Sequence, residues 1–99
     1  MRRYLLVKVC SEKPVAFTGD QLMDAIMVAV RKFFGEFGAN QIDPRMIRFD
    51  SSKAEAIIAC RKDQEGELQA AVALITEICG SSIAALTLKV SGTIKSLST

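Results

Sequence analysis

The side chains that most often carry out catalysis or bind metals are few in this sequence. There is no histidine, so a serine or cysteine nucleophile would have no imidazole as its base, and the most common ligand of catalytic zinc is missing. The three cysteines, Cys10, Cys60 and Cys79, are isolated and form no Cys-x-x-Cys pair. We therefore expect them to be small core residues, and their odd number favours a cytosolic protein without a disulfide framework.

Carboxylates are the remaining groups that could act on a substrate or hold a metal ion. Asp43, Asp50 and Asp63 fall near the ends of predicted elements, but their spacing matches no metal-binding pattern. Solvated surface acids are the expectation for all three. The sequence therefore predicts no catalytic residue, no metal site and no cofactor on this chain.

Basic residues give the next signal, and it depends on where they lie. The 13 lysines and arginines exceed the 11 acids by only two, which is mild for a nucleic-acid-binding domain. The segment from Lys89 to Thr99 nevertheless contains two lysines and no acid. We expect an RNA contact through one aromatic and five basic residues, namely Tyr4, Lys8, Arg48, Arg61, Lys89 and Lys95.

The first half of the chain reads as a strand followed by a long helix. Residues Arg3 to Cys10 alternate, with Leu5, Val7 and Val9 on one face and Tyr4, Leu6 and Lys8 on the other. Thr18 and Gln21 form a capping-box pattern, and Gly35 and Gly38 mark the expected end of the helix. The predicted inward stripe is Leu22, Ile26, Ala29, Val30, Phe33 and Phe37. Met23, Met27 and Phe34 widen that stripe and are predicted to form a protein interface.

The second half reads as a hairpin, a helix and a last strand. Met46 to Asp50 and Glu55 to Arg61 are predicted strands joined by a turn. A helix is expected from Gln64 to Cys79, with Asp63 as its cap. A strand from Ile83 to Ser91 is expected to turn Leu86, Leu88 and Val90 inward and Thr87 and Lys89 outward, and residues 92–99 are expected to form a polar tail.

This order of elements predicts an α+β fold of the ferredoxin-like or RRM-like βαββαβ type. The expected single domain covers residues 1–99, with a four-stranded antiparallel sheet, both helices on one face, and the first and third strands at its centre. No apolar run reaches the length of a membrane-spanning helix.

Two functions that this fold supports can be weighed on particular residues. Acylphosphatases need an arginine in the loop after the first strand, and here Ser11 to Val15 has none. RNA-recognition motifs stack bases on exposed aromatics, but the third strand offers only Ile57, Ala59 and Arg61 beside Tyr4. The sheet face is thus either a solvated surface or a surface that binds phosphates through charges and a protein partner through apolar residues.

Several segments together resemble the archaeal ribonuclease P protein component 2 family, which is related to a subunit of eukaryotic ribonuclease P and ribonuclease MRP. The resemblance covers almost the whole chain, and residues 89–95 are its most specific part. Its segments are Arg3-Tyr-Leu-Leu-Val-Lys-Val9, Glu12-Lys-Pro14, Phe34-Gly-Glu-Phe-Gly38, Ile47-Arg-Phe-Asp50, Cys60-Arg61, Ala73-Leu-Ile-Thr-Glu-Ile78 and Lys89-Val-Ser-Gly-Thr-Ile-Lys95.

The resemblance implies an RRM-like subunit that supports a catalytic RNA in removing the 5′ leader of precursor tRNA. The implied partners are the ribonuclease P RNA, the TIM-barrel-like protein component 3 and, within a heterotetramer, a second copy of the chain; precursor tRNA is met indirectly, and Mg²⁺ is expected on the RNA. Two features depart from the family, because the turn from Ser51 to Glu55 has no glycine and no longer basic tail follows Thr99. The alternative is a self-associating or ligand-sensing module of the same fold without an RNA role.

Overall fold

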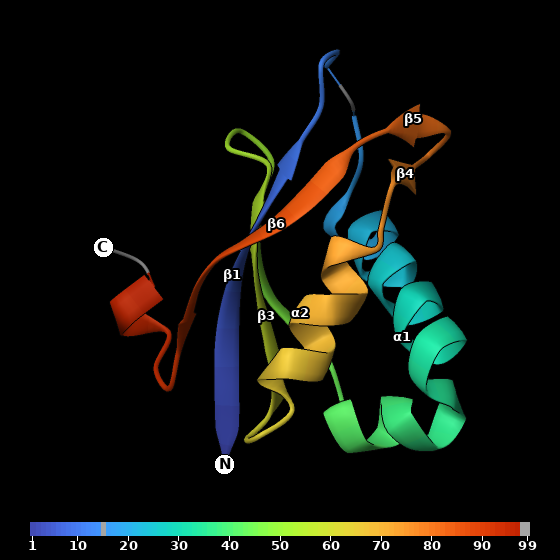
Figure 1. The fold of residues 1–99 in the computed structure, drawn as a ribbon. Coiled ribbons are helices and arrows are strands. Elements are labelled where there is room, and N and C mark those ends of the chain that lie inside the picture. Colours follow the sequence, from blue (N-terminus) through green and yellow to red (C-terminus); the bar gives the residue numbers. More distant parts are fainter. Residues whose placement is uncertain (15, 98–99) are drawn as a thin grey trace.

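A four-stranded antiparallel sheet with both helices packed on one of its faces makes up the fold (Figure 1). The computed structural model describes residues 1–14 and 16–97. The sheet contains β1 (Arg2–Cys10), β2 (Arg45–Asp50), β3 (Glu55–Arg61) and β6 (Ala84–Ser91), in the order β2-β3-β1-β6. The helices are α1 (Gly19–Ile42) and α2 (Glu65–Ala73). The βαββαβ prediction, with the first and third strands at the centre, is confirmed.

Alternation along the two central strands places the core between the sheet and the helices. Leu5, Val7 and Val9 of β1 are buried against the helices, together with Ala56, Ile58 and Cys60 of β3. The predicted α1 residues Leu22, Ile26, Ala29 and Val30 complete this core with Leu68, Ala71 and Val72 of α2. Removing this apolar surface from water is the main term that stabilises such a layer.

Helix α1 begins as predicted but does not end at its glycines. The Thr18 hydroxyl accepts a hydrogen bond from the Gln21 N–H at 3.1 Å, and the Gln21 side chain accepts one from the Thr18 N–H at 2.8 Å. Gly35 has φ 71° and ψ −179° and kinks the helix, which then resumes and ends at Ile42. The kink turns Ala39 and Ile42 back into the core.

The kink also explains why the predicted inward stripe fails at its C-terminal end. Phe33 and Phe37 are exposed, not buried, and for Phe37, which follows the kink, the change of helical register at Gly35 is the reason. Met23, Met27 and Phe34 are half-buried and pack against the core. The exposed apolar residues of α1 are therefore Val28, Phe33 and Phe37, whereas the predicted interface through Met23, Met27 and Phe34 stays a prediction.

Helix α2 is shorter than predicted because a small hairpin replaces its expected last turns. The helix ends at Ala73, and β4 (Glu77–Ile78) pairs with β5 (Ser81–Ser82). Cys79 and Gly80, the two turn residues, both have positive φ, as a two-residue hairpin turn of type I′ requires. Asp63 does not cap the helix, since Gln64 is the N-cap residue and makes no side-chain capping bond.

The faces of the last strand differ from the prediction because the pairing of β1 with β6 shifts between Leu6 and Val7. Val7 pairs with Thr87 and Leu6 with Lys89, which leaves Leu88 as an extra residue. Leu86 and Leu88 are consequently exposed, Ala85 is buried, and Thr87 faces the helices. The outward orientation of Lys89 is confirmed by its pairing with Leu6.

The cysteines should differ sharply in their reactivity toward an alkylating reagent. Cys60 is fully buried on the helix side of β3, and burial raises the pKa of its thiol to about 11. Cys79 is exposed in the turn between β4 and β5. In peptide mapping after timed alkylation at mildly alkaline pH, we expect Cys79 to react first and Cys60 only when the protein is unfolded. Equal rates at the two thiols in the native protein would contradict this.

Candidate nucleic-acid interface

The sheet face opposite the helices presents the residues that the sequence suggested for RNA contact. Pairing of β1 with β3 sets Tyr4 beside Ala59, Leu6 beside Ile57 and Lys8 beside Glu55 on this open face. Arg48 of β2 lies across from Ile57, and Lys89 of β6 lies across from Leu6. The structure therefore brings Tyr4, Lys8, Arg48, Arg61 and Lys89 to one face of the sheet.

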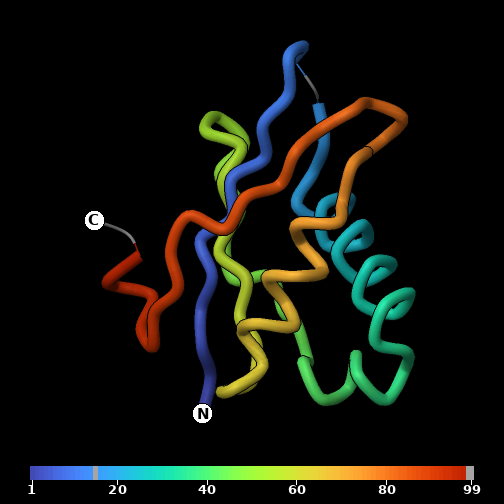
Figure 2. Tube along the Cα trace, in the orientation of Figure 1, coloured from blue at the N-terminus to red at the C-terminus, as the bar shows by residue number. Residues whose placement is uncertain are grey.

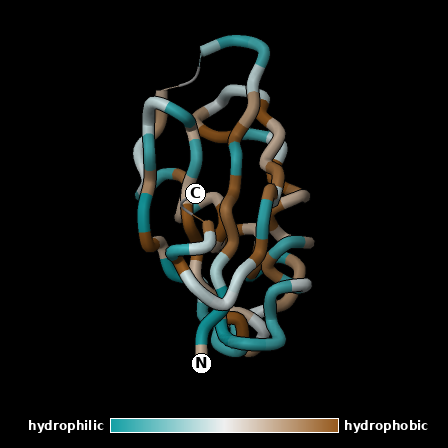
Figure 3. The backbone as a smooth tube through the Cα atoms, turned by 90° about the vertical axis from the view of Figure 1, so that its left-hand side faces the viewer, coloured by the Kyte–Doolittle hydropathy of each residue, from teal (hydrophilic) through white to brown (hydrophobic). Residues whose placement is uncertain are grey.

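The C-terminal segment covers part of this open face. A short 3₁₀ helix, η1 (Lys95–Leu97), lies on the side of the sheet away from α1 and α2 (Figure 1; the trace is clearer in Figure 2). Figure 3 looks onto the open face and shows this segment in front of the strands. Leu97 is 4% exposed and shares a hollow with Leu6 and Ile57. The expected polar tail is thus ordered as far as Leu97, and residues 98–99 lie outside the described part of the chain.

Several of the polar groups on this face are used within the chain. The Lys89 ammonium donates to the Ser96 carbonyl at 2.7 Å, and the Ser91 and Ser96 hydroxyls are 2.7 Å apart. The Lys8 ammonium donates to the Lys53 carbonyl. Lys95 is exposed in η1. Two of the predicted RNA-binding lysines therefore also hold the chain together.

Aromatic stacking on the sheet finds little support in the structure. Phe49 faces the helices, where its ring centroid is 5.5 Å from that of Phe17. Tyr4 is the aromatic residue that the described strands place on the open face, and it is half-buried. The chemistry of the face is therefore electrostatic and apolar, with no array of rings for successive bases.

One cluster of charges was missed by the sequence analysis. Asp43, expected to be a solvated acid, lies at the C-terminal end of α1 within 4 Å of three arginines. Arg2, Arg45 and Arg61 come from β1, β2 and β3. The hydrogen bond from Arg2 lowers the pKa of the Asp43 carboxyl, so the carboxylate is ionised at neutral pH. The strand register pairs Arg2 with Arg61, and this pairing is the feature from which part of the cluster could have been predicted.

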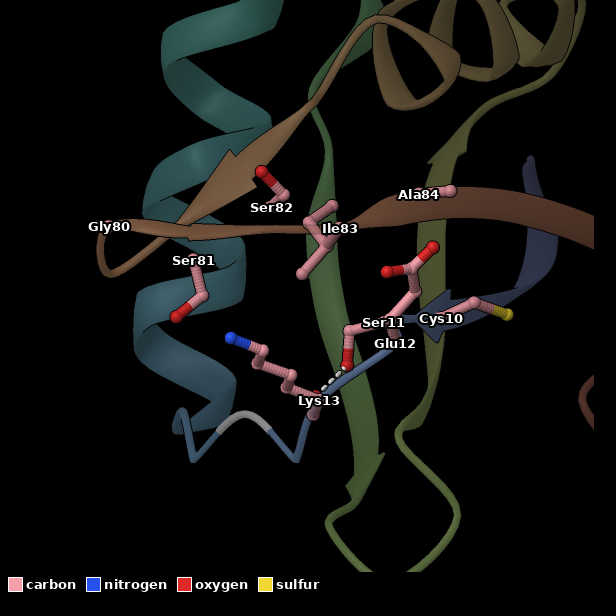
Figure 4. A pocket seen from close by; sticks show the side chains of 9 residues that line it. All are labelled: Cys10, Ser11, Glu12, Lys13, Gly80, Ser81, Ser82, Ile83 and Ala84. Carbon is pink, nitrogen blue, oxygen red and sulfur yellow. Dashed lines mark hydrogen bonds between the residues drawn. The ribbon is translucent and has the colours of Figure 1, made fainter.

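A second hollow lies between the end of β1 and the β4–β5 hairpin. It has a volume of about 850 Å³ and is lined by Cys10 to Lys13 and Gly80 to Ala84 (Figure 4). The Ser11 hydroxyl donates to the Lys13 carbonyl, and among the described residues no hydrogen bond joins it to a carboxylate or an amine. The hollow therefore contains hydroxyls, a carboxylate and an ammonium but no arrangement that would activate a nucleophile.

Neither a group of metal ligands nor a membrane-spanning helix is found in the described part of the chain. Within residues 1–14 and 16–97, no three cysteine, aspartate or glutamate side chains gather as metal ligands would. None of the helices there is both long and apolar enough to cross a bilayer.

Comparisons with known proteins give a consistent family. Residues 3–99 match the model of the Rpp14/Pop5 family. Ribonuclease P protein component 2 of Thermococcus kodakarensis is 35% identical, and the match covers 96% of this chain and 78% of the relative. The same protein of Thermococcus gammatolerans is 37% identical, and that of Pyrococcus furiosus 33%. A chain in the cryo-EM structure of yeast ribonuclease MRP has the same fold, with a TM-score of 0.75 at 15% identity over 93% of this chain and 74% of that chain.

Proposed function

The chain belongs to the Rpp14/Pop5 family, and from this membership we propose that it acts as a non-catalytic protein subunit of ribonuclease P. The family match over residues 3–99 carries the proposal. The archaeal relatives named ribonuclease P protein component 2, which this chain matches over nearly its whole length, support it further. A self-associating module without an RNA role is not favoured, because such a module would not account for that match.

In this proposal the RNA carries out hydrolysis and the chain supports it. The ribonuclease P RNA, with bound Mg²⁺, removes the 5′ leader of precursor tRNA in the cytoplasm. The chain meets the tRNA only indirectly, and none of its side chains takes part in the chemical step. The absence of histidine and the separation of the described carboxylates agree with this division of labour.

Two surfaces of the chain are assigned to two kinds of partner. The open sheet face and its basic edge contact RNA, through Tyr4, Lys8, Arg48, Arg61, Lys89 and Lys95. The outer surface of α1 contacts protein component 3, through Met23, Met27 and Phe34 together with the exposed Val28 and Phe37. A second copy of the chain joins the complex as part of a heterotetramer.

Reconstituted cleavage of precursor tRNA tests the proposed function. We expect the complex lacking this chain to need more Mg²⁺ for the same rate, because the protein would stabilise the folded RNA. Alanine at each described acid should leave the rate at saturating Mg²⁺ close to wild type, since no side chain acts on the phosphodiester. The measurement is the single-turnover cleavage rate across a Mg²⁺ titration.

Two results would refute the proposal in different ways. If the chain changed neither the Mg²⁺ requirement nor the rate, it would not be a working subunit. If one acidic substitution abolished cleavage in a complex that still assembled, the chain would carry a catalytic group. Assembly is checked by gel filtration of each variant with the RNA and partner proteins.

A further inference from the structure

In the arginine cluster around Asp43, the proposed function assigns a role to Arg61 alone. Arg2 donates to the Asp43 carbonyl at 2.8 Å and to its Oδ2 at 2.5 Å. Arg45 lies 3.3 Å from the same oxygen and Arg61 3.9 Å from it. The cluster stands where the N-terminus, the end of α1 and the loop after β3 meet at one end of the sheet (Figure 1). Three strands and one helix end thus converge on a single carboxylate.

Charge is concentrated in this cluster. It takes three of the 13 basic residues and one of the 11 acids, so the rest of the chain is electrically balanced and the net charge of +2 resides here. The neighbouring Glu65 pairs with Arg3 on the helix side, at 3.7 Å, and does not join the cluster. One carboxylate cannot neutralise three guanidinium groups, and a second anion would relieve their mutual repulsion.

The three arginines have different roles in the cluster. Arg2 is only 28% exposed and binds Asp43 through two of its nitrogens. Arg45 and Arg61 are 65% and 56% exposed, and their contacts with Asp43 are longer. Each guanidinium group has five N–H donors, and the single carboxylate of Asp43 can accept hydrogen bonds from only a few of the donors of the three arginines. Arg45 and Arg61 therefore direct donors toward solvent.

Asp43 holds these side chains in a fixed position. Its backbone is in the left-handed conformation, with φ 48°, and its N–H donates to the Ala39 carbonyl at 2.8 Å. Asp43 accepts from Arg45 Nε at 3.4 Å through its other carboxylate oxygen. Side chains ordered in this way lose less conformational entropy when they bind an anion.

We propose that Arg45 and Arg61, positioned by Asp43 and Arg2, form a phosphate-binding site for the backbone of the RNA partner. Planar guanidinium groups match phosphate oxygens with paired hydrogen bonds. Lys8 and Lys89 donate to carbonyls of the chain itself, whereas among the described residues Arg45 and Arg61 pair with one acid, Asp43. Which RNA is bound follows from the proposed function, on which this inference rests. That the bound group is a phosphate follows from the geometry and charge of the arginines.

The test compares two double variants in the assembled complex with ribonuclease P RNA. Arg45→Gln with Arg61→Gln removes the two exposed arginines and leaves the Asp43–Arg2 pair intact. Lys13→Gln with Arg31→Gln removes the same charge far from the cluster, where Arg31 pairs with Glu36 at 3.1 Å. We expect the first pair to weaken RNA binding about tenfold at moderate salt and to reduce the salt slope by roughly 1.5, whereas the control stays near wild type.

A further variant distinguishes the effect of positive charge from the effect of the paired guanidinium donors. The variant with lysine at both positions keeps the charge but not the paired donors, and we expect it to bind between wild type and the glutamine variant. Unchanged affinity of the glutamine pair, or equal weakening by both pairs, would overturn the site while leaving the subunit role in place. If wild-type protein neither bound the RNA nor supported cleavage, the proposed function itself would be refuted.

A titration with inorganic phosphate tests the site without RNA. The NMR signals of the Nε–H groups of Arg45 and Arg61 should both shift as phosphate is added. Unshifted signals would contradict a phosphate site.

Discussion

Replacing Gly35 by alanine is expected to destabilise the protein by about 1–3 kcal/mol, although nothing in the structure crowds the new methyl group. A Cβ built at Gly35 meets no atom within 4 Å, so the cost arises from the backbone alone. The angles φ 71° and ψ −179° belong to a region that is essentially restricted to glycine. Chemical denaturation of Gly35→Ala and wild type measures the difference in the free energy of unfolding.

Gly66 provides the matched control for this prediction. It lies in α2, has no positive φ, and a Cβ there also meets no atom within 4 Å. Gly66→Ala should therefore stabilise the protein by about 0.4–1 kcal/mol, because alanine is the better helix former. The same substitution thus has opposite signs at the two positions. A Gly35→Ala variant as stable as wild type would show that the kink is not a required feature of α1.

Gly38 is needed near the kink for a different reason. A Cβ at this position would stand 2.5 Å from the Cβ of Phe34, an atom that cannot move without its backbone. The two glycines together let α1 bend and return Ala39 and Ile42 to the core, and they deliver Asp43 to the arginine cluster. The Phe34-Gly-Glu-Phe-Gly38 segment therefore links the packing of α1 to the proposed phosphate site.

The elements were predicted correctly where a single hydrophobic periodicity continued through the whole element. Leu5, Val7 and Val9 alternate along β1, and the predicted bounds of β3, Glu55 to Arg61, are those observed. The prediction failed where two signals overlapped. Leu68, Val72 and Ile75 continue a helical spacing, but the Cys79-Gly80 turn and the β-branched residues before it form the β4–β5 hairpin instead.

Irregular strand pairing and hydrogen bonds to backbone carbonyls account for most of the remaining differences between the predicted and the observed structure. The extra residue Leu88 changes the alternation within β6, so that Leu86 and Thr87 before it lie on the faces opposite to those expected, whereas Lys89 after it lies on the expected face. The lysines Lys8 and Lys89 were assigned to the correct face, but their carbonyl acceptors at Lys53 and Ser96 leave no trace in the sequence. The cluster around Asp43 could not be predicted from the sequence alone, since Arg2 and Arg61 are distant from Asp43 in the chain and only the tertiary fold brings them together.

Leu97 is expected to control whether the open face of the sheet is covered. Its side chain is 4% exposed, whereas Leu88 on the neighbouring strand is 53% exposed. Leu97→Asp should release η1, because the shorter, charged side chain loses the apolar contact with Leu6 and Ile57 in a hollow that both acids and bases line. Leu88→Asp introduces the same change at an exposed position and should leave η1 in place.

The expected loss of global stability for Leu97→Asp is about 1–2 kcal/mol. Burial of a leucine contributes about 1.5–3 kcal/mol. Part of that is recovered, because the released segment regains conformational entropy. The local effects should be larger, since detachment ends the hydrogen bonds from Leu97 N–H to the Ile94 carbonyl and from Lys89 to the Ser96 carbonyl. The first bond closes the turn of η1 itself, and the second ties η1 to the sheet.

Hydrogen exchange and dye binding can measure this detachment directly. The amide of Leu97 should exchange at least about tenfold faster in Leu97→Asp than in Leu88→Asp, because local opening then costs almost no free energy. Binding of a hydrophobic dye should rise only in Leu97→Asp, as Leu6 and Ile57 become accessible. An unchanged exchange rate at residue 97 would mean that the polar contacts of Lys89, Ser91 and Thr93 hold the segment without the leucine. In that case the cover over the open face would rest on hydrogen bonds and not on the burial of Leu97.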